Sequence, residues 1–131
     1  MCRYRVVHTG MDINSLFFGL AVTDFAAADS WYSRLFGRAA DFVVVPGVEA
    51  MWQLSNTAFL YIVVDPEHAG QALVNIAVSD LNDAVAEIAS RDLDPGPSIL
   101  VGPGGTAGRK APFTDPDGNS ISIIEIAAVH R

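Results

Sequence analysis

A tight turn followed by a strand is predicted by the stretch FTDPDGNSISIIEI at residues 113–126. Pro116 presets φ for a turn, the neighbouring aspartates bond to local backbone, and Gly118 tolerates a positive φ. Serine and isoleucine then alternate over residues 120–123, which is the period of a strand with two unlike faces. Glu125 interrupts the apolar run, and a carboxylate in such a strand needs a partner, a metal ion or water. The functional question therefore depends largely on Glu125.

The composition indicates one globular domain with a substantial core. The chain has 131 residues, of which 50% are hydrophobic, and a chain of this length buries roughly two-thirds of its unfolded surface. No apolar run reaches the roughly 18 residues of a membrane span, and no signal peptide is recognised. Cys2 is the single cysteine, which excludes an intramolecular disulfide and is typical of a cytoplasmic protein.

The net charge of −7 disfavours nucleic acid as a partner. Nucleic-acid binding depends on clustered lysine and arginine, and the basic residues here are scattered except for Arg109 and Lys110. An acidic surface attracts a cationic ligand, although the same charge also serves solubility. We expect neither a nucleic acid nor a membrane as partner.

Two successive halves of the chain predict the same order of elements, β-α-β-β-β. For the first half we expect strands and one helix, in the order 16–22, helix 26–36, 42–45, 50–54 and 58–64. For the second half the expected order is 73–78, helix 82–91, 99–101, 109–113 and 119–126. The glycine-rich residues 102–105 are expected to form a loop. Such a repeated order favours an internal duplication.

A local sequence repeat supports the duplication. Residues 21–25 read AVTDF and residues 77–81 read AVSDL, so that Asp24 and Asp80 are separated by 80 − 24 = 56 positions. Each aspartate follows a strand and precedes a helix, and we expect both to cap those helices. Trp31 in the first helix is expected in the core.

Three motifs in this order resemble the vicinal oxygen chelate superfamily, which includes glyoxalase I, extradiol dioxygenases and the bleomycin-resistance proteins. They are VTDF leading to WYSRLFG at residues 22–37, VSDLNDA at 78–84, and the turn and strand at 113–125. The resemblance implies an α+β fold: two βαβββ modules form a curled mixed sheet around a groove, with the helices on its outer face. It also implies a homodimer.

The expected domain organisation follows from this resemblance. Residues 1–12 are expected to form an N-terminal extension, and residues 13–131 a single domain of the glyoxalase/bleomycin-resistance type. Module 1 would occupy about residues 15–65 and module 2 about residues 72–127.

The positions of the metal ligands depart from the pattern of the metal-dependent members. The resemblance places these ligands at Phe17, Leu73 and Glu125, and only the last of these side chains offers an electron pair. Catalytic sites for Zn²⁺ and similar ions commonly use three protein ligands. The histidines lie outside the strands concerned, at His8, His68 and His130. We therefore expect no tightly bound metal cofactor, with a divalent ion held by other ligands as the alternative.

The same superfamily contains acidic, metal-free members that bind drugs, and the remaining residues suit such a groove. Aromatic faces stack on planar ligands and attract cations, so an aromatic or cationic small molecule is expected. The candidate ligand-binding residues are Phe17, Trp52, Gln53, Tyr61, Leu73, Asn75, Phe113 and Glu125. Asn75 shares strand parity with Leu73, and the two should face the same side. For Trp52 a place in the core is an equal alternative. For Glu125 the alternative is pairing with Arg109 or with an arginine of a partner chain.

The resulting hypothesis is a small-molecule binding protein with an aromatic groove. Two alternatives stay open. One is a lyase, isomerase or dioxygenase that recruits metal ligands from the partner chain or from His68, or that uses Glu125 as a general base without a metal. The other is a degenerate structural dimer whose pocket is filled by Phe17 and Leu73.

Overall fold

The computed structural model describes residues 10–127. Within this range the strands and helices follow one another in the predicted order, and the expected boundaries agree to within two residues. Cys2, His8 and His130, together with most of the expected N-terminal extension, lie outside the described residues.

The first half of the chain forms a four-stranded mixed sheet, here called the N-terminal sheet. Its elements are β1 (Leu16–Val22), α1 (Phe25–Phe36), β2 (Phe42–Val45), β3 (Glu49–Gln53) and β4 (Ala58–Val64). The strand order is β1-β4-β3-β2, with β1 and β4 parallel and the other pairs antiparallel. The strands are rich in β-branched and aromatic residues, which pack well on a pleated surface.

The second half repeats this arrangement in the C-terminal sheet. Its elements are β5 (Leu73–Ala77), α2 (Leu81–Ala89), β6 (Ile99–Val101), β7 (Gly108–Thr114) and β8 (Ser120–Ile126). The order β5-β8-β7-β6 matches that of the first sheet, with β5 and β8 parallel. A short 3₁₀ turn at Pro103–Gly105 stands within the expected loop. The predicted α+β fold of two βαβββ modules is confirmed, and the sheets are curled rather than closed.

Both helices begin at the predicted aspartate. Asp24 accepts a hydrogen bond from the amide of Ala27 at 3.1 Å, and Asp80 accepts one from Asp83 at 3.0 Å. These caps satisfy amides that the first helical turn leaves without intrahelical partners. Gly37 ends α1 in the left-handed conformation, with φ of 75°. In residues 10–127 no helix has the length and apolar character to cross a membrane.

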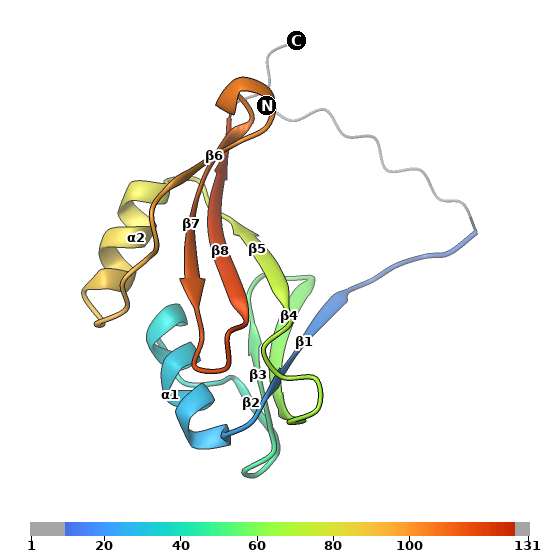
Figure 1. The fold of residues 1–131 in the computed structure, drawn as a ribbon. Coiled ribbons are helices and arrows are strands. Elements are labelled where there is room, and N and C mark those ends of the chain that lie inside the picture. Colours follow the sequence, from blue (N-terminus) through green and yellow to red (C-terminus); the bar gives the residue numbers. More distant parts are fainter. Residues whose placement is uncertain (1–9, 128–131) are drawn as a thin grey trace.

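One hydrophobic core joins the two sheets. It combines Leu20, Trp52 and Leu60 from the N-terminal sheet with Phe113 and Ile121 from the C-terminal sheet. In α1, the expected core residue Trp31 and its neighbour Tyr32 are buried in the same cluster. Figure 1 shows α1 and α2 together on one side of the molecule, with the strands on the other. The face of each sheet that meets this core is called its helix face below, and the opposite face its open face.

The open faces are assigned by strand parity and register, because side chains alternate along a strand. On the N-terminal sheet, this face carries Phe17, Gly19, Ala21, Phe42, Glu49, Met51, Gln53, Phe59, Tyr61 and Val63. On the C-terminal sheet, it includes Leu73, Asn75, Ala77, Lys110, Pro112, Thr114, Ser120, Ser122 and Ile124. Since the helix faces meet in one core, the open faces are turned away from it.

The turn at residues 115–119 is held by a buried carboxylate. Asp115, 4% exposed, accepts hydrogen bonds from the hydroxyl of Tyr32 at 2.7 Å and the side-chain amide of Asn119 at 2.8 Å. The backbone amides of Asp117 and Asn119 donate to its other oxygen, each at 2.9 Å. Burial, and then the bond to Asp115, raises the pKa of Tyr32, so its hydroxyl remains a donor.

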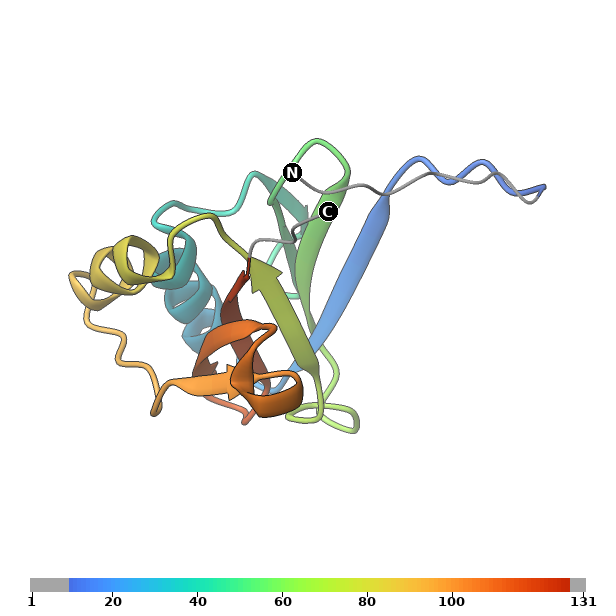
Figure 2. The ribbon, with the colours of Figure 1, turned by 90° about the horizontal axis from the view of Figure 1, so that it is seen from above.

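The same turn ties the two sheets together. The Asn119 side chain donates to the carbonyl of Ala21 and accepts from the amide of Ala72, both at 3.0 Å. Asp117 accepts from the hydroxyl of Thr23 at 2.6 Å. The end of β1 is thereby fixed beside the start of β5, and Figure 2 shows these two strands diverging from that point.

Replacing Tyr32 with phenylalanine tests how much the buried bond to Asp115 contributes. We expect Tyr32→Phe to lower the free energy of unfolding by about 1.5–3 kcal/mol, because a bond to a buried charged acceptor is lost. Urea unfolding measures the change. The matched control is Tyr61→Phe, whose hydroxyl has no partner among residues 10–127 and whose loss should change stability by less than about 0.5 kcal/mol. Equal effects of the two substitutions would contradict the assigned role.

Candidate ligand-binding site

An aromatic patch lies on the open face of the N-terminal sheet. The rings of Phe17 and Phe59 stack with centroids 4.5 Å apart and an interplanar angle of 9°. They are cross-strand neighbours on β1 and β4, and Gln53 on β3 completes the row. Phe17 is 53% exposed, so a large part of the stacked surface faces solvent.

A glycine gives a second aromatic residue its place in this patch. Gly19 and Tyr61 are cross-strand neighbours, and a Cβ at Gly19 would overlap the ring and hydroxyl of Tyr61. The phenol therefore lies across β1 where a side chain would otherwise stand. Phe17, Phe59 and Tyr61, here called the aromatic floor, form one continuous surface on two neighbouring strands.

The open face of the C-terminal sheet is more polar. Asn75 on β5 lies opposite Ser122 on β8, and Leu73 lies opposite Ser120 in the next row. Asn75 and Leu73 share a face as predicted, and Leu73 is 85% exposed. Ser122 is only 3% exposed, and its hydroxyl has no hydrogen-bond partner among residues 10–127. The middle row of this face thus offers the exposed side-chain amide of Asn75, with the Ser122 hydroxyl nearly covered beside it.

Two of the predicted ligand-binding residues lie in the core instead. Trp52 is fully buried on the helix face, and its indole nitrogen donates to the carbonyl of Arg38 at 3.0 Å. Phe113 is 1% exposed and faces the core beside its cross-strand neighbour Ile121. Strand parity explains both positions, because the neighbours Gln53 and Met51 of Trp52 take the open face. Neither ring is available to a ligand on the open faces.

Glu125 also faces away from the groove in which we expected it. It shares the parity of Ile121 and Ile123, which belong to the helix face. One carboxylate oxygen accepts a hydrogen bond at 2.8 Å from the amide of Leu81, the first residue of α2. A carboxylate at a helix N-terminus is stabilised by the unpaired amides and the helix dipole. Glu125 therefore anchors α2 to β8, which corrects the expectation of a groove anchor.

The residues that the sequence resemblance assigns to metal positions do not fit a metal ion. Phe17 and Leu73 have hydrocarbon side chains on the open faces, and the Glu125 carboxylate is on the opposite side of its sheet. His68 pairs with Asp65 at 2.8 Å in the connection between β4 and β5. In the part of the chain that is described, no group of three or more His, Cys, Asp or Glu residues is arranged to hold a metal.

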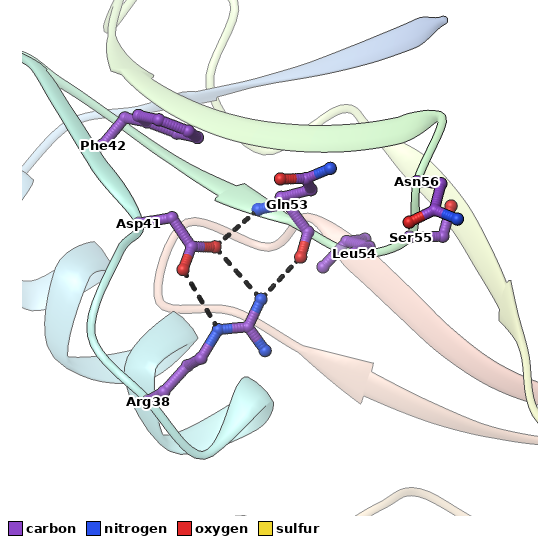
Figure 3. A pocket seen from close by; sticks show the side chains of 7 residues that line it. All are labelled: Arg38, Asp41, Phe42, Gln53, Leu54, Ser55 and Asn56. Carbon is purple, nitrogen blue, oxygen red and sulfur yellow. Dashed lines mark hydrogen bonds and ion pairs between the residues drawn. The ribbon is translucent and has the colours of Figure 1, made fainter.

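A polar pocket of about 460 Å³ opens at the corner of the N-terminal sheet and is called the corner pocket below. It is lined by Arg38, Asp41, Phe42, Gln53, Leu54, Ser55 and Asn56 (Figure 3). Phe42 and Gln53 are also members of the open face, so the pocket adjoins the aromatic floor through the row of Phe59. Of these lining residues, only Gln53 was among the predicted site residues.

The side chains of Arg38 and Asp41 bond to the backbone of Gln53, as a neighbouring strand would. The Asp41 carboxylate accepts a hydrogen bond from the backbone amide of Gln53 at 2.7 Å, and the Arg38 guanidinium donates one to the backbone carbonyl of the same residue. The two side chains also bond to each other, at 3.1 and 3.4 Å (Figure 3). The Arg38 guanidinium, and then the Gln53 amide, holds the pKa of Asp41 below its ordinary value. The Asp41 carboxylate therefore stays charged near neutral pH.

Solved structures with this fold include proteins of the expected superfamily. A glyoxalase/bleomycin resistance protein from Catenulispora acidiphila DSM 44928 is 37% identical, with a TM-score of 0.78 over 86% of this chain and 98% of that one. A lactoylglutathione lyase from Agrobacterium tumefaciens is 18% identical, with a TM-score of 0.68 over 84% and 91%. A bleomycin-binding protein complexed with bleomycin is 19% identical, with a TM-score of 0.67 over 86% and 98%. No family model and no curated protein sequence matches this chain.

These comparisons carry different weight. The lyase and the bleomycin-binding protein, at 18% and 19% identity, share the fold alone. The protein from Catenulispora acidiphila is 37% identical, is covered over 98% of its own length and has the same architecture. With 37% identity across 86% of its length, this chain belongs to the glyoxalase/bleomycin resistance protein family, within the vicinal oxygen chelate superfamily.

Proposed function

We propose that this protein binds a small planar molecule on the aromatic floor, as a cytoplasmic homodimer and without a tightly held metal ion. The observation that carries the proposal is the exposed stack of Phe17 on Phe59, continued by Tyr61 over Gly19. Aromatic rings left partly in water gain free energy when a flat apolar ligand covers them.

The ligand's polar part would meet the C-terminal sheet of a second copy. Each open face is turned away from the core that the two sheets share, so a second copy can cover it. Large apolar side chains on both faces are exposed, with Leu73 at 85% and Phe17 at 53%. A dimer that apposes unlike open faces would bury both of these side chains. Asn75 and Ser122 would then stand opposite the aromatic floor.

The chemistry of the three expected ligand positions supports a site that works without a metal. Phe17 and Leu73 cannot coordinate an ion, and Glu125 already accepts the amide of Leu81. The position of Glu125 also removes the one carboxylate among the candidate ligand-binding residues. The proposed ligand is planar because it stacks on the aromatic floor. A positive charge on it is not required.

Phe17→Ala tests the aromatic floor, with 2-methoxynaphthalene as a planar, uncharged probe. Its fluorescence is titrated with protein, using excitation outside the tryptophan band. We expect the substitution to weaken binding about three- to tenfold, because a stacking contact contributes roughly 0.5–1.5 kcal/mol.

The matched control for this experiment is Leu16→Ala. Leu16 is the preceding residue of β1, is similarly exposed at 56%, and has the opposite strand parity. Its replacement should leave the affinity unchanged. A wild-type protein that does not bind the probe, or equal losses in both variants, would rule out the aromatic floor as the site.

Leu73→Glu tests the proposed dimer. We expect light scattering to show two chains for the wild type and one chain for the variant, since a charge would be buried in the apposed faces. The side chain is 85% exposed in one chain, so the monomer should keep its fold. Leu100→Glu, at a 68% exposed position of opposite parity on β6, should remain dimeric. A monomeric wild type would contradict the proposal.

Metal content tests the third part of the proposal. Protein purified without chelators or a histidine tag should contain far less than one ion per chain, also after incubation with Zn²⁺, Mn²⁺, Ni²⁺ or Fe²⁺. Glu125→Gln should leave this value unchanged and lower the free energy of unfolding by about 0.3–1 kcal/mol, because the interaction with the α2 N-terminus is weakened. Near-stoichiometric metal that is lost in Glu125→Gln would refute a metal-free site.

A further inference from the structure

The corner pocket has the size and position of a second ligand subsite. Its volume of about 460 Å³ falls within the range of roughly 300–1,000 Å³ that is usual for small-molecule sites. Gln53 is the cross-strand neighbour of Phe59, and Phe42 is the neighbour of Met51, which is paired in turn with Tyr61. A substituent of a molecule on the aromatic floor therefore reaches the pocket along the rows of the sheet.

The charges in the corner pocket cancel. Arg38 and Asp41 are the charged residues of its lining, and each bonds to the other. Asp41 also accepts the Gln53 amide, which fixes the pair against the sheet edge. An ionic ligand group of either sign would meet one partner that repels it. The pocket is thus built for an uncharged group.

The amide and hydroxyl side chains of the pocket both donate and accept hydrogen bonds, and the Arg38 guanidinium adds a donor. The side-chain amides of Gln53 and Asn56 and the Nη1 group of Arg38 have no partner among residues 10–127. The hydroxyl of Ser55 accepts the amide of Thr57 at 3.4 Å and keeps its proton for donation. An amide offers two donors and one acceptor with two lone pairs. Such groups match hydroxyls, which also donate and accept.

One wall of the pocket is apolar. Phe42 is 47% exposed, and Figure 3 shows its ring on the same side of the strands as the side chain of Gln53. A ring with hydroxyls around its rim and carbon-bound hydrogens on its faces satisfies both parts of this lining. Its faces suit the aromatic wall, and its rim suits the amides.

We propose that the corner pocket binds an uncharged, hydroxyl-rich ring, such as a sugar, that is attached to the planar ligand. The proposal rests on the proposed function, because the planar part of the same molecule would occupy the aromatic floor. It assigns Asn56 and Gln53 as the residues that distinguish a glycosylated ligand from its bare aromatic core.

Three probes with one aromatic core test this assignment: 2-methoxynaphthalene, 2-naphthyl β-D-glucopyranoside and 2-naphthyl sulfate. All are titrated by fluorescence with the full chain. We expect the glucoside to bind at least about fivefold more tightly than 2-methoxynaphthalene, from two or more added hydrogen bonds. The sulfate should bind no more tightly than 2-methoxynaphthalene, because Asp41 offsets Arg38.

Asn56→Leu locates the effect in the pocket. Asn56 lies in the exposed turn between β3 and β4, so its replacement should leave the fold and the binding of 2-methoxynaphthalene unchanged while removing most of the glucoside's advantage. Asn82→Leu is the matched control, at an exposed position of α2 in the other half of the chain. It should preserve that advantage in full.

The outcomes separate this inference from the proposed function. Equal affinities for the glucoside and 2-methoxynaphthalene would overturn the sugar subsite and leave the aromatic floor intact. A tighter-binding sulfate would identify Arg38 as an anion site and would also overturn it. If none of the three probes binds, the proposed function fails and this inference fails with it.

Discussion

The hydrogen bonds that converge on the buried carboxylate of Asp115 are the constraint on which the rest of the structure depends. Four donors, from Tyr32, Asp117 and Asn119, compensate for its removal from water. The turn that they define places Asn119 between Ala21 and Ala72, where the two sheets meet. Removing any donor leaves a partly unpaired charge in the core, which costs more than an exposed hydrogen bond. Because Asn119 bonds to both sheets, this turn holds the end of β1 beside the start of β5 and so helps to fix how the two sheets lie relative to each other.

The duplicated architecture explains why one chain presents two unlike surfaces. Each module buries its helix face in the shared core and leaves its other face without a cover. The first module places stacked rings there, and the second places Asn75 and Ser122. A flat ligand with a polar substituent needs both kinds of surface. The proposed pairing of two copies brings them together without any change in the fold of either chain.

The order of elements could be predicted from the sequence because turns, caps and periodicity are local properties. Asp24 and Asp80 cap their helices, as their positions suggested. The orientation of Glu125 was also encoded, since it follows the phase of Ile121 and Ile123 rather than that of the serines. The resemblance to the metal-dependent members assigned Glu125 to the groove, whereas its strand parity indicated the helix face. The corner pocket could not be predicted, because Arg38 and Asp41 meet Gln53 only after β2 and β3 have paired.

The link between Arg38, Asp41 and Gln53 has a consequence for how copies of this chain associate. An unpaired strand edge is a template for another strand, and so for open-ended growth into fibres. Here the backbone groups of Gln53 already have side-chain partners, and the outer strand β2 is short and has a register shift between Val43 and Val45. Strand addition at this edge is therefore obstructed. In the proposed dimer, contact through the open faces would close on itself after two copies, which leaves no open-ended route for growth through the exposed apolar surface.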